Sequence, residues 1–178
     1  QLAGSPRDRI IQRGLKPDTT PPPAWAISAA ANAFPPLAPG LRGSIREVEP
    51  RDPQARLVAL TFDLCELANE RSGYDAELVN GLREFGVKAT FFAGGKWLRT
   101  HPEQAMQLMA DPNFEIGNHA WTHVNLRLVS GPEARDQMLW TQAQYQVLRR
   151  ELAGRSCTRE AGPGALSHIP EWPSVFRF

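Results

Sequence analysis

The sequence contains little that would assign it to several large classes of protein. Among its 178 residues there are only two cysteines, Cys65 and Cys157, and they do not form a CxxC pair. Two cysteines are too few for a disulfide framework, and the sequence leaves open whether they form one bridge or remain two buried thiols. Positive charge is not in excess, because 20 Lys and Arg oppose 19 Asp and Glu. No nucleic-acid partner is therefore expected.

Long hydrophobic runs are also missing. No stretch approaches the roughly 18 apolar residues that a transmembrane helix requires, so we expect no transmembrane segment. The chain begins at Gln1 without a charged region followed by an apolar one, which predicts either a cytosolic protein or one whose targeting segment has been removed. There is no glycine-rich nucleotide loop and no internal repeat. An apolar content of 42% with 22% charged residues is that of an ordinary domain with one core.

Proline, in contrast, is concentrated near the start of the chain, where it includes the run Pro21 to Pro23. Proline blocks hydrogen-bonded ladders and favours extended backbone. We therefore interpret residues 1–53 as a Pro-rich N-terminal arm and residues 54–178 as the main domain. Within the arm, an apolar island predicts a short helix at Ala24–Phe34 that docks its apolar side on the domain, and a short strand is expected at Ser44–Glu49.

The rest of the chain alternates between strand and helix patterns. Apolar, β-favouring runs predict strands buried on both faces, and amphipathic segments bounded by capping residues predict helices. The strands are expected at Leu57–Phe62, Val87–Ala93 and Phe114–Gly117, and the helices at Asp75–Phe85, Pro102–Ala110 and Gly131–Leu152. After Gly154 we expect loop, until a further strand begins at Val175. This order predicts parallel βα units in an α/β fold, and it is compatible with both an open sheet and a barrel.

Two histidines four residues apart, His119 and His123, follow the third predicted strand. On a helical turn, two imidazoles with this spacing lie on the same side and can share one metal ion. Asp63 follows the first predicted strand, and the carboxyl ends of parallel strands meet at one edge of a sheet. The spacing therefore predicts a metal site at this edge. The alternatives are that Asp63 braces a loop and that the two histidines are solvated or hydrogen-bonded.

Three short motifs resemble those of the polysaccharide deacetylases with NodB homology, also called carbohydrate esterase family 4. Leu60–Asp63 is similar to the start of the motif T-F-D-D-G, Lys88–Phe92 matches K-A-T-F-F, and Glu115–Leu126 is similar to E-I-G-N-H-x-x-x-H-x-x-L. The order and spacing of the motifs match over about residues 56–153. The resemblance implies a distorted (β/α) barrel, incomplete in this chain, that removes N- or O-acetyl groups from a glycan.

The resemblance also implies roles for individual residues. In the family, a divalent metal, usually zinc, is held by an aspartate and two histidines, here Asp63, His119 and His123. A metal-bound water attacks the acetyl carbonyl, and the first aspartate of the motif, Asp63, is the general base. Arg177 resembles the opening of a later motif, whose arginine orients this base. The motifs that come next in the family, including the general-acid histidine, are missing, so we expect a partial domain.

The first motif departs from the family pattern at the metal ligand. Leu64 stands in place of the second aspartate, which is the usual ligand, and Cys65 stands in place of the glycine. Four alternatives for the third ligand stay open. They are Asp63 itself, Glu66, water, and Cys65, whose soft thiolate suits a structural zinc site better than a hydrolytic one.

Three further residues near these motifs carry weaker expectations. His101 and His168 lie outside any motif, and we expect both at the surface or in loops. Trp121, between the two metal-site histidines, either stacks on a sugar ring or packs beneath its loop, and we prefer the packing alternative.

Together, these patterns favour a secreted or periplasmic, metal-dependent deacetylase whose partner is an acetylated glycan. A carbohydrate-binding relative that has lost catalysis is the first alternative, motivated by Leu64 and the missing general acid. A metal-independent amidohydrolase on the same fold is the second, because one fold supports several chemistries.

Overall fold

The structure is a computed structural model that describes residues 11–33, 39, 43, 49–162 and 164–177. In chain order its elements are α1 (Ala24–Ala33), β1 (Leu60–Leu64), α2 (Ala76–Glu84), β2 (Ala89–Ala93), α3 (Gly95–Thr100), α4 (Pro102–Ala110), β3 (Phe114–Asn118), α5 (Gly131–Gly154) and α6 (Ser156–Ala161). The predicted strand at Ser44–Glu49 lies, except for its last residue, outside the described residues. None of the helices in the described part of the chain has the length and apolar character needed to cross a membrane.

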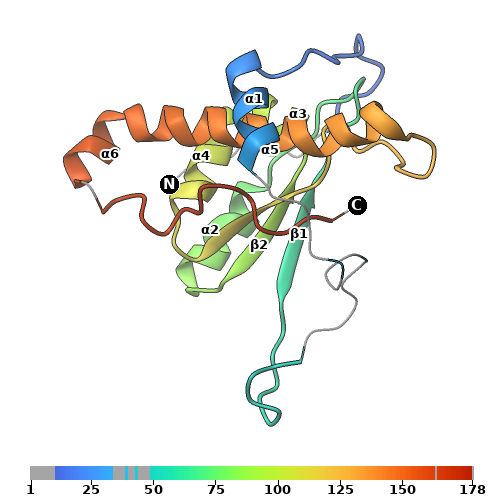
Figure 1. The fold of residues 1–178 in the computed structure, drawn as a ribbon. Coiled ribbons are helices and arrows are strands. Elements are labelled where there is room, and N and C mark those ends of the chain that lie inside the picture. Colours follow the sequence, from blue (N-terminus) through green and yellow to red (C-terminus); the bar gives the residue numbers. More distant parts are fainter. Residues whose placement is uncertain (1–10, 34–38, 40–42, 44–48, 163, 178) are drawn as a thin grey trace.

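The three strands form one parallel sheet in the order β1-β2-β3 (Figure 1). The register aligns Leu64 with Ala93 and Ala93 with Asn118, so all three strands end at the same edge. Parallel neighbours joined by helices are the βα units that the sequence predicts, and the α/β class is confirmed.

The first strand begins three residues later and ends two residues later than predicted. Leu57 and Val58 are 75% and 85% exposed, and they belong to a segment that extends away from the domain before β1 begins (Figure 1). Asp63 lies within β1 and not after it. The apolar run identified the strand, but its bounds depend on where the chain can pair with β2, which begins at Ala89.

The second helix, α2, begins and ends as its capping residues predict. The side chain of Asp75 accepts a hydrogen bond from the backbone N–H of Leu78 at 3.0 Å. After the last turn, Gly86 has a φ of +62°, which glycine adopts at little cost. The sequence pattern also predicts a shared apolar face of Leu78, Leu82 and Phe85. This prediction is partly wrong, because Leu82 packs against the core but Leu78 and Phe85 are 40% and 80% exposed. The fully buried residues of the helix are Ala76 and Val79.

The core lies where α3, α4 and α5 pack against one another, with α4 and α5 also in contact with β3. Its fully buried members include Phe91, Trp97, Leu98, Leu108 and Leu148. Two of the helices, α3 and α6, were not predicted. Each has only six residues, which is too short for a helical apolar period to show.

His101 was expected at the surface or in a loop; it does lie in the connection between two helices, but it is buried and not at the surface. It is 8% exposed, between α3 and α4, and its ring stacks on Trp97 with centroids 4.8 Å apart. Sequence spacing could not reveal this burial because it depends on the unpredicted helix α3. His168 is exposed, as expected.

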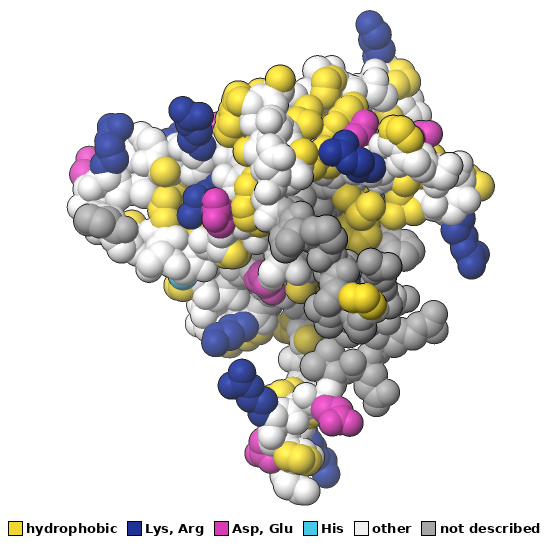
Figure 2. Space-filling view, viewed as in Figure 1, with side chains coloured by type: hydrophobic (Ala, Val, Ile, Leu, Met, Phe, Trp, Pro, Cys, Tyr) yellow, Lys and Arg dark blue, Asp and Glu magenta, His cyan; other side chains and the backbone are white. Residues whose placement is uncertain are grey.

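The predicted helix of the arm is confirmed as α1, which packs on α5. The buried centre of the contact is made of small side chains, Ala26 and Ala30 of α1 with Ala143 of α5, and larger hydrophobic residues of both helices pack around it. Trp25 stays 45% exposed, with the guanidinium of Arg150 lying 5.1 Å from its ring centroid. Hydrophobic side chains gather around α1 and the adjoining part of α5, whereas Lys and Arg are scattered over the face in view (Figure 2).

Both cysteines are free. Cys65 is half-buried at the end of β1, and Cys157 is exposed on α6. Neither of the alternatives left open by the sequence, a bridge or two buried thiols, therefore describes this pair.

Candidate metal centre

The two histidines of the predicted metal site lie in the loop that follows β3, and not on a helical turn as expected. Their ring centroids are 4.7 Å apart, with an angle of 51° between the ring planes. The backbone is left-handed at Ala120, with φ of 62°, and at His123, with φ of 52°. Such values are uncommon for residues with a side chain. The pair therefore converges because the loop turns sharply, and not because of helical periodicity.

Two helices hold this histidine loop, residues 119–123, in place. In α5, Oε1 of Gln137 accepts hydrogen bonds from the backbone N–H groups of Trp121 and Thr122, at 3.0 and 2.9 Å. The first two N–H groups of α3 donate to the carbonyl oxygens of Ala120 and Trp121, both at 2.9 Å. These bonds give the loop the partners that an irregular, buried backbone requires. Neither contribution was predicted, since α3 is too short to show a helical pattern and Gln137 belongs to no motif.

Trp121 packs beneath the histidine loop, as preferred. It is 1% exposed and meets Trp140 edge to face, with centroids 5.7 Å apart. A Cβ atom at Gly95 would lie 2.2 Å from the Trp121 ring, so the start of α3 approaches the indole as only glycine permits. Stacking of this ring on a sugar is therefore excluded.

His119 has the protonation and surroundings of a metal ligand. It is 2% exposed, and its Nδ1 lies 2.7 Å from the carbonyl oxygen of Arg177. A carbonyl only accepts, so Nδ1 carries the hydrogen and Nε2 has a free lone pair. Nε2 is buried and has no hydrogen-bond partner in the described part of the chain. Burial also lowers the pKa of His119 below its ordinary value, which favours the neutral ring that binds metals.

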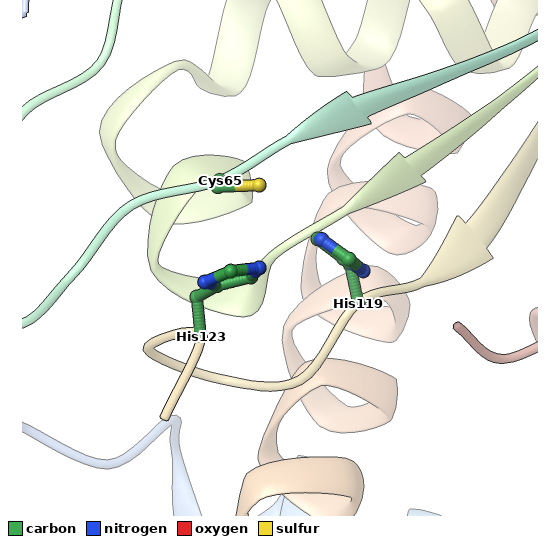
Figure 3. Close-up of side chains that lie close together, drawn as sticks. All are labelled: Cys65, His119 and His123. Carbon is green, nitrogen blue, oxygen red and sulfur yellow. The ribbon is translucent and has the colours of Figure 1, made fainter. Parts of the chain in front are cut away.

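Cys65 completes a cluster of three donor atoms. The ligand atoms of Cys65, His119 and His123 all lie within 4.8 Å of one another, and the three side chains point toward a shared space (Figure 3). Burial, with a further contribution from the charge of Asp63, raises the pKa of the Cys65 thiol to about 11. Two imidazoles and a thiolate form a ligand set that zinc accepts. The donor set therefore fits the divalent metal that the family resemblance implies.

Asp63 and Arg177 meet beside this cluster, although 114 residues separate them. Nη1 of Arg177 lies 3.4 Å from Oδ1 of Asp63 and donates a hydrogen bond to Oγ1 of Thr61 at 2.9 Å. The guanidinium lies over the Phe92 ring, 4.3 Å from its centroid. The carboxylate of Asp63 is 41% exposed and is not among the three grouped ligand atoms.

The terminal segment brings Arg177 to the site by pairing with the end of β3. The backbone N–H of Asn118 donates to the carbonyl of Val175 at 2.8 Å, and the N–H of Arg177 donates to the carbonyl of Asn118 at 3.0 Å. Phe176 thereby forms a parallel bridge with β3. The strand expected from Val175 is thus present as a single bridge in the described residues.

Glu66, an alternative third ligand, is engaged elsewhere. Its side chain is fully buried and accepts hydrogen bonds from the N–H of Ser72 and from Oγ1 of Thr100, both at 2.9 Å. Nζ of Lys96 lies 3.5 Å from its other oxygen. Glu66 therefore braces the loop after β1 and is not part of the three-atom cluster.

An open groove of about 460 Å³ adjoins the site on the β1 side. Asp63 and Cys65 line it together with the loop before α2, which includes Tyr74, and Ile11 of the arm. A groove in contact with both the carboxylate and the thiol offers room for a ligand at the reacting groups.

The fold and the site together define a class of protein. It is an α/β protein in which histidines and a carboxylate lie at the carboxyl ends of parallel strands, an arrangement that can bind a metal ion. Comparison with known proteins is more specific. The polysaccharide deacetylase family model matches residues 51–152, more than half of the chain, and the chain belongs to this family. The expected fold class, parallel βα units of the NodB-type barrel that are incomplete in this chain, is confirmed.

Several relatives have names that state an activity. The chain is 36% identical over 101 residues to the peptidoglycan-N-acetylglucosamine deacetylase of Bacillus cereus, which covers 54% of this chain and 32% of that protein. It is 31% identical over 99 residues to the peptidoglycan-N-acetylmuramic acid deacetylase PdaC of Bacillus subtilis, and this match covers 56% of this chain and 20% of that protein. The chain thus spans about a third or less of the length of these relatives.

Among solved structures, the chain is similar to a CE4 family pseudoenzyme from Bacillus anthracis. The two share 29% sequence identity with a TM-score of 0.44, and the match covers 55% of this chain and 33% of the other.

Proposed function

We propose that this domain removes acetyl groups from a glycan as part of a metal-dependent deacetylase. Membership of the polysaccharide deacetylase family supports this proposal, as do relatives named as peptidoglycan deacetylases. The observation that carries it is the free, buried Nε2 of His119, which has His123 beside it and the Asp63–Arg177 pair at the same edge of the sheet.

In the proposed mechanism, His119 and His123 would hold a divalent metal, and zinc is one that imidazole ligands bind. When bound, the metal supplies a Lewis acid that polarises the acetyl carbonyl and makes water more acidic. The backbone carbonyl of Arg177 keeps His119 in the tautomer that presents Nε2.

Asp63 acts as general base in this proposal. It takes a proton from water as the water oxygen bonds to the acetyl carbon. The bond from that carbon to the sugar nitrogen or oxygen then breaks, and the departing atom takes up a proton from the Asp63 carboxyl group or from solvent, so that acetate and the deacetylated sugar are released. Arg177 orients the carboxylate through their ion pair. The further expectation that Asp63 also binds the metal stays a prediction, and its pairing with Arg177 favours the role of base.

Acetate release from acetylated peptidoglycan and chitin-type oligosaccharides tests the proposal, with the protein supplied with zinc. We expect Asp63→Asn to lower turnover by about 100-fold or more, the usual contribution of a general base, without a change in the circular dichroism spectrum. The exposed Asp52 offers a matched control, because Asp52→Asn makes the same chemical change far from the site. The absence of acetate release from the zinc-loaded protein would refute a deacetylase.

One observation favours a second function, a carbohydrate-binding relative without catalysis. Leu64 packs against the main core and leaves no carboxylate at the position of the usual ligand. Such a protein would bind oligosaccharide equally well with Asp63→Asn and release no acetate. A metal-independent amidohydrolase, in contrast, would keep its activity in a chelator.

The secreted or periplasmic location is also part of the proposal, and cell fractionation tests it.

A further inference from the structure

We propose that Cys65 is the third protein ligand of the metal centre, as a thiolate in place of the family's carboxylate. This inference rests on the metal centre of the proposed function. It goes beyond that proposal because it assigns a sulfur ligand, which changes the metals that the site prefers.

The geometry of the cluster is the first support. The donor atoms of Cys65, His119 and His123 lie within 4.8 Å of one another, although the cysteine comes from the end of β1 and the histidines from the loop after β3 (Figure 3). The end of one strand and the loop after another thus supply three donors to one place, which is how metal sites in parallel βα folds are assembled.

The unpartnered nitrogen of His119 is a second, independent support. A buried polar atom without a partner destabilises the folded chain, because it has lost its hydrogen bonds to water. His119 uses Nδ1 with the Arg177 carbonyl, so Nε2 is the atom left for the cluster. A metal ion bound at this position removes that cost. Of the three donor residues in the cluster, Cys65 is the one that comes from outside the histidine loop.

Strand geometry explains why the ligand is residue 65 and not residue 64. Successive side chains of a strand point to opposite faces. Leu64 packs against the main core, so Cys65 turns to the opposite side, toward the histidines. The backbone N–H of Gly94 donates to the carbonyl of Leu64 at 2.9 Å, and this bond fixes the direction in which the chain leaves β1.

Lys96 ties the two halves of the cluster together. Its backbone N–H donates to the carbonyl of Trp121 in the histidine loop at 2.9 Å. Its side chain, 4% exposed, donates to the carbonyl of Leu67 at 2.9 Å and pairs with the buried Glu66. One residue at the start of α3 therefore holds both the loop with the histidines and the loop that follows Cys65. Lys96 and Glu66 are positioning residues in this proposal.

Sulfur ligation has a chemical consequence for the metal. The S–H bond of Cys65 breaks on binding and its proton goes to solvent, since the thiolate is the ligand. The protein ligands then carry one negative charge, as with an aspartate and two histidines. A soft thiolate, however, favours zinc and cobalt over magnesium and manganese, which prefer oxygen ligands.

Titration of the metal-free chain with Co²⁺ tests the assignment without any assay of activity. We expect a sulfur-to-cobalt charge-transfer band in the near ultraviolet for the unsubstituted chain. Cys65→Ser should lose the band and bind Co²⁺ more weakly, by at least the roughly 10–100-fold that outer-shell substitutions cost. Cys157→Ser is the matched control, because it removes the exposed thiol and should leave the band unchanged.

Two results would overturn the assignment. In the first, the unsubstituted chain binds Co²⁺ but shows no charge-transfer band. This experiment does not depend on the folding of any variant. The other is loss of Co²⁺ binding in Asp63→Asn with binding unchanged in Cys65→Ser, which would make the carboxylate the ligand. Acetate release without the band refutes only the sulfur ligand, and the band without acetate release refutes only the deacetylase.

Discussion

The buried pair of Lys96 and Glu66 leads to the sharpest prediction about this fold. Both side chains are almost completely enclosed, at 4% and 0% exposed, with 3.5 Å between Nζ and Oε2. Lys96→Met keeps most of the unbranched side chain and removes its charged ammonium group. The substitution leaves the carboxylate of Glu66 buried without its ion-pair partner, and it takes the donor away from the carbonyls of Leu67 and Glu70.

The expected cost follows from this enclosure. Removing one partner of a buried ion pair costs about 3–5 kcal/mol, because the remaining charge stays desolvated. Domains of ordinary size are stable by about 5–15 kcal/mol, so the variant should lose a large share of its stability. The double variant Glu66→Gln with Lys96→Met removes both charges, and it should be more stable than the sum of the single changes predicts, by about 0.5–3 kcal/mol.

Urea unfolding followed by circular dichroism measures these free energies. Arg13 of the N-terminal arm offers a control, because it pairs with Glu70 of the same loop at 3.1 Å but is 75% exposed. Arg13→Met should change the free energy of unfolding by less than about 1 kcal/mol. If Lys96→Met falls within the range of this exposed control, the reasoning from burial is wrong. In a variant that remains folded, we also expect weaker Co²⁺ binding, since the loop after Cys65 loses its anchor.

Three other predictions concern the same site. Gly95→Ala should destabilise the domain by about 1–3 kcal/mol through overpacking, since the new Cβ would lie 2.2 Å from the Trp121 ring. Gly81→Ala is the control, because no atom lies within 4 Å of its Cβ, and it should be neutral or stabilising in urea unfolding. Gln137→Ala should weaken Co²⁺ binding and lower the free energy of unfolding by about 1–3 kcal/mol, because two N–H groups of the histidine loop lose their acceptor. Gln137→Glu keeps an acceptor and should lower the free energy of unfolding by less. Burial raises the pKa of Cys65 to about 11, and only the thiolate reacts with iodoacetamide. The rate of Cys65 alkylation in metal-free protein should therefore rise steadily from pH 7 to pH 10. A rate that reaches a plateau below pH 9, measured by peptide mapping, would contradict this.

Local chemistry was sufficient to predict most of the regular elements, although not the six-residue helices α3 and α6. Caps and breakers such as Asp75, Gly86 and Pro102 act within one turn of their own positions, and the helices they delimit have nearly the predicted bounds. The apolar runs likewise identified the strands, although β1 is displaced, since pairing with β2 decides where a strand begins. The short helix α3 was missed because six residues carry too little pattern.

The site divides in the same way. The residue types, the order of the motifs and the family can be recognised in the sequence alone, because they depend on chemistry and spacing along the chain. The three-dimensional structure was needed to show that His119 presents Nε2, that Arg177 reaches Asp63 and that Cys65 rather than Glu66 lies with the histidines. These contacts join the end of β1, the loop after β3 and the terminal segment, and their distances depend on how a parallel sheet and α3 bring remote parts of the chain together.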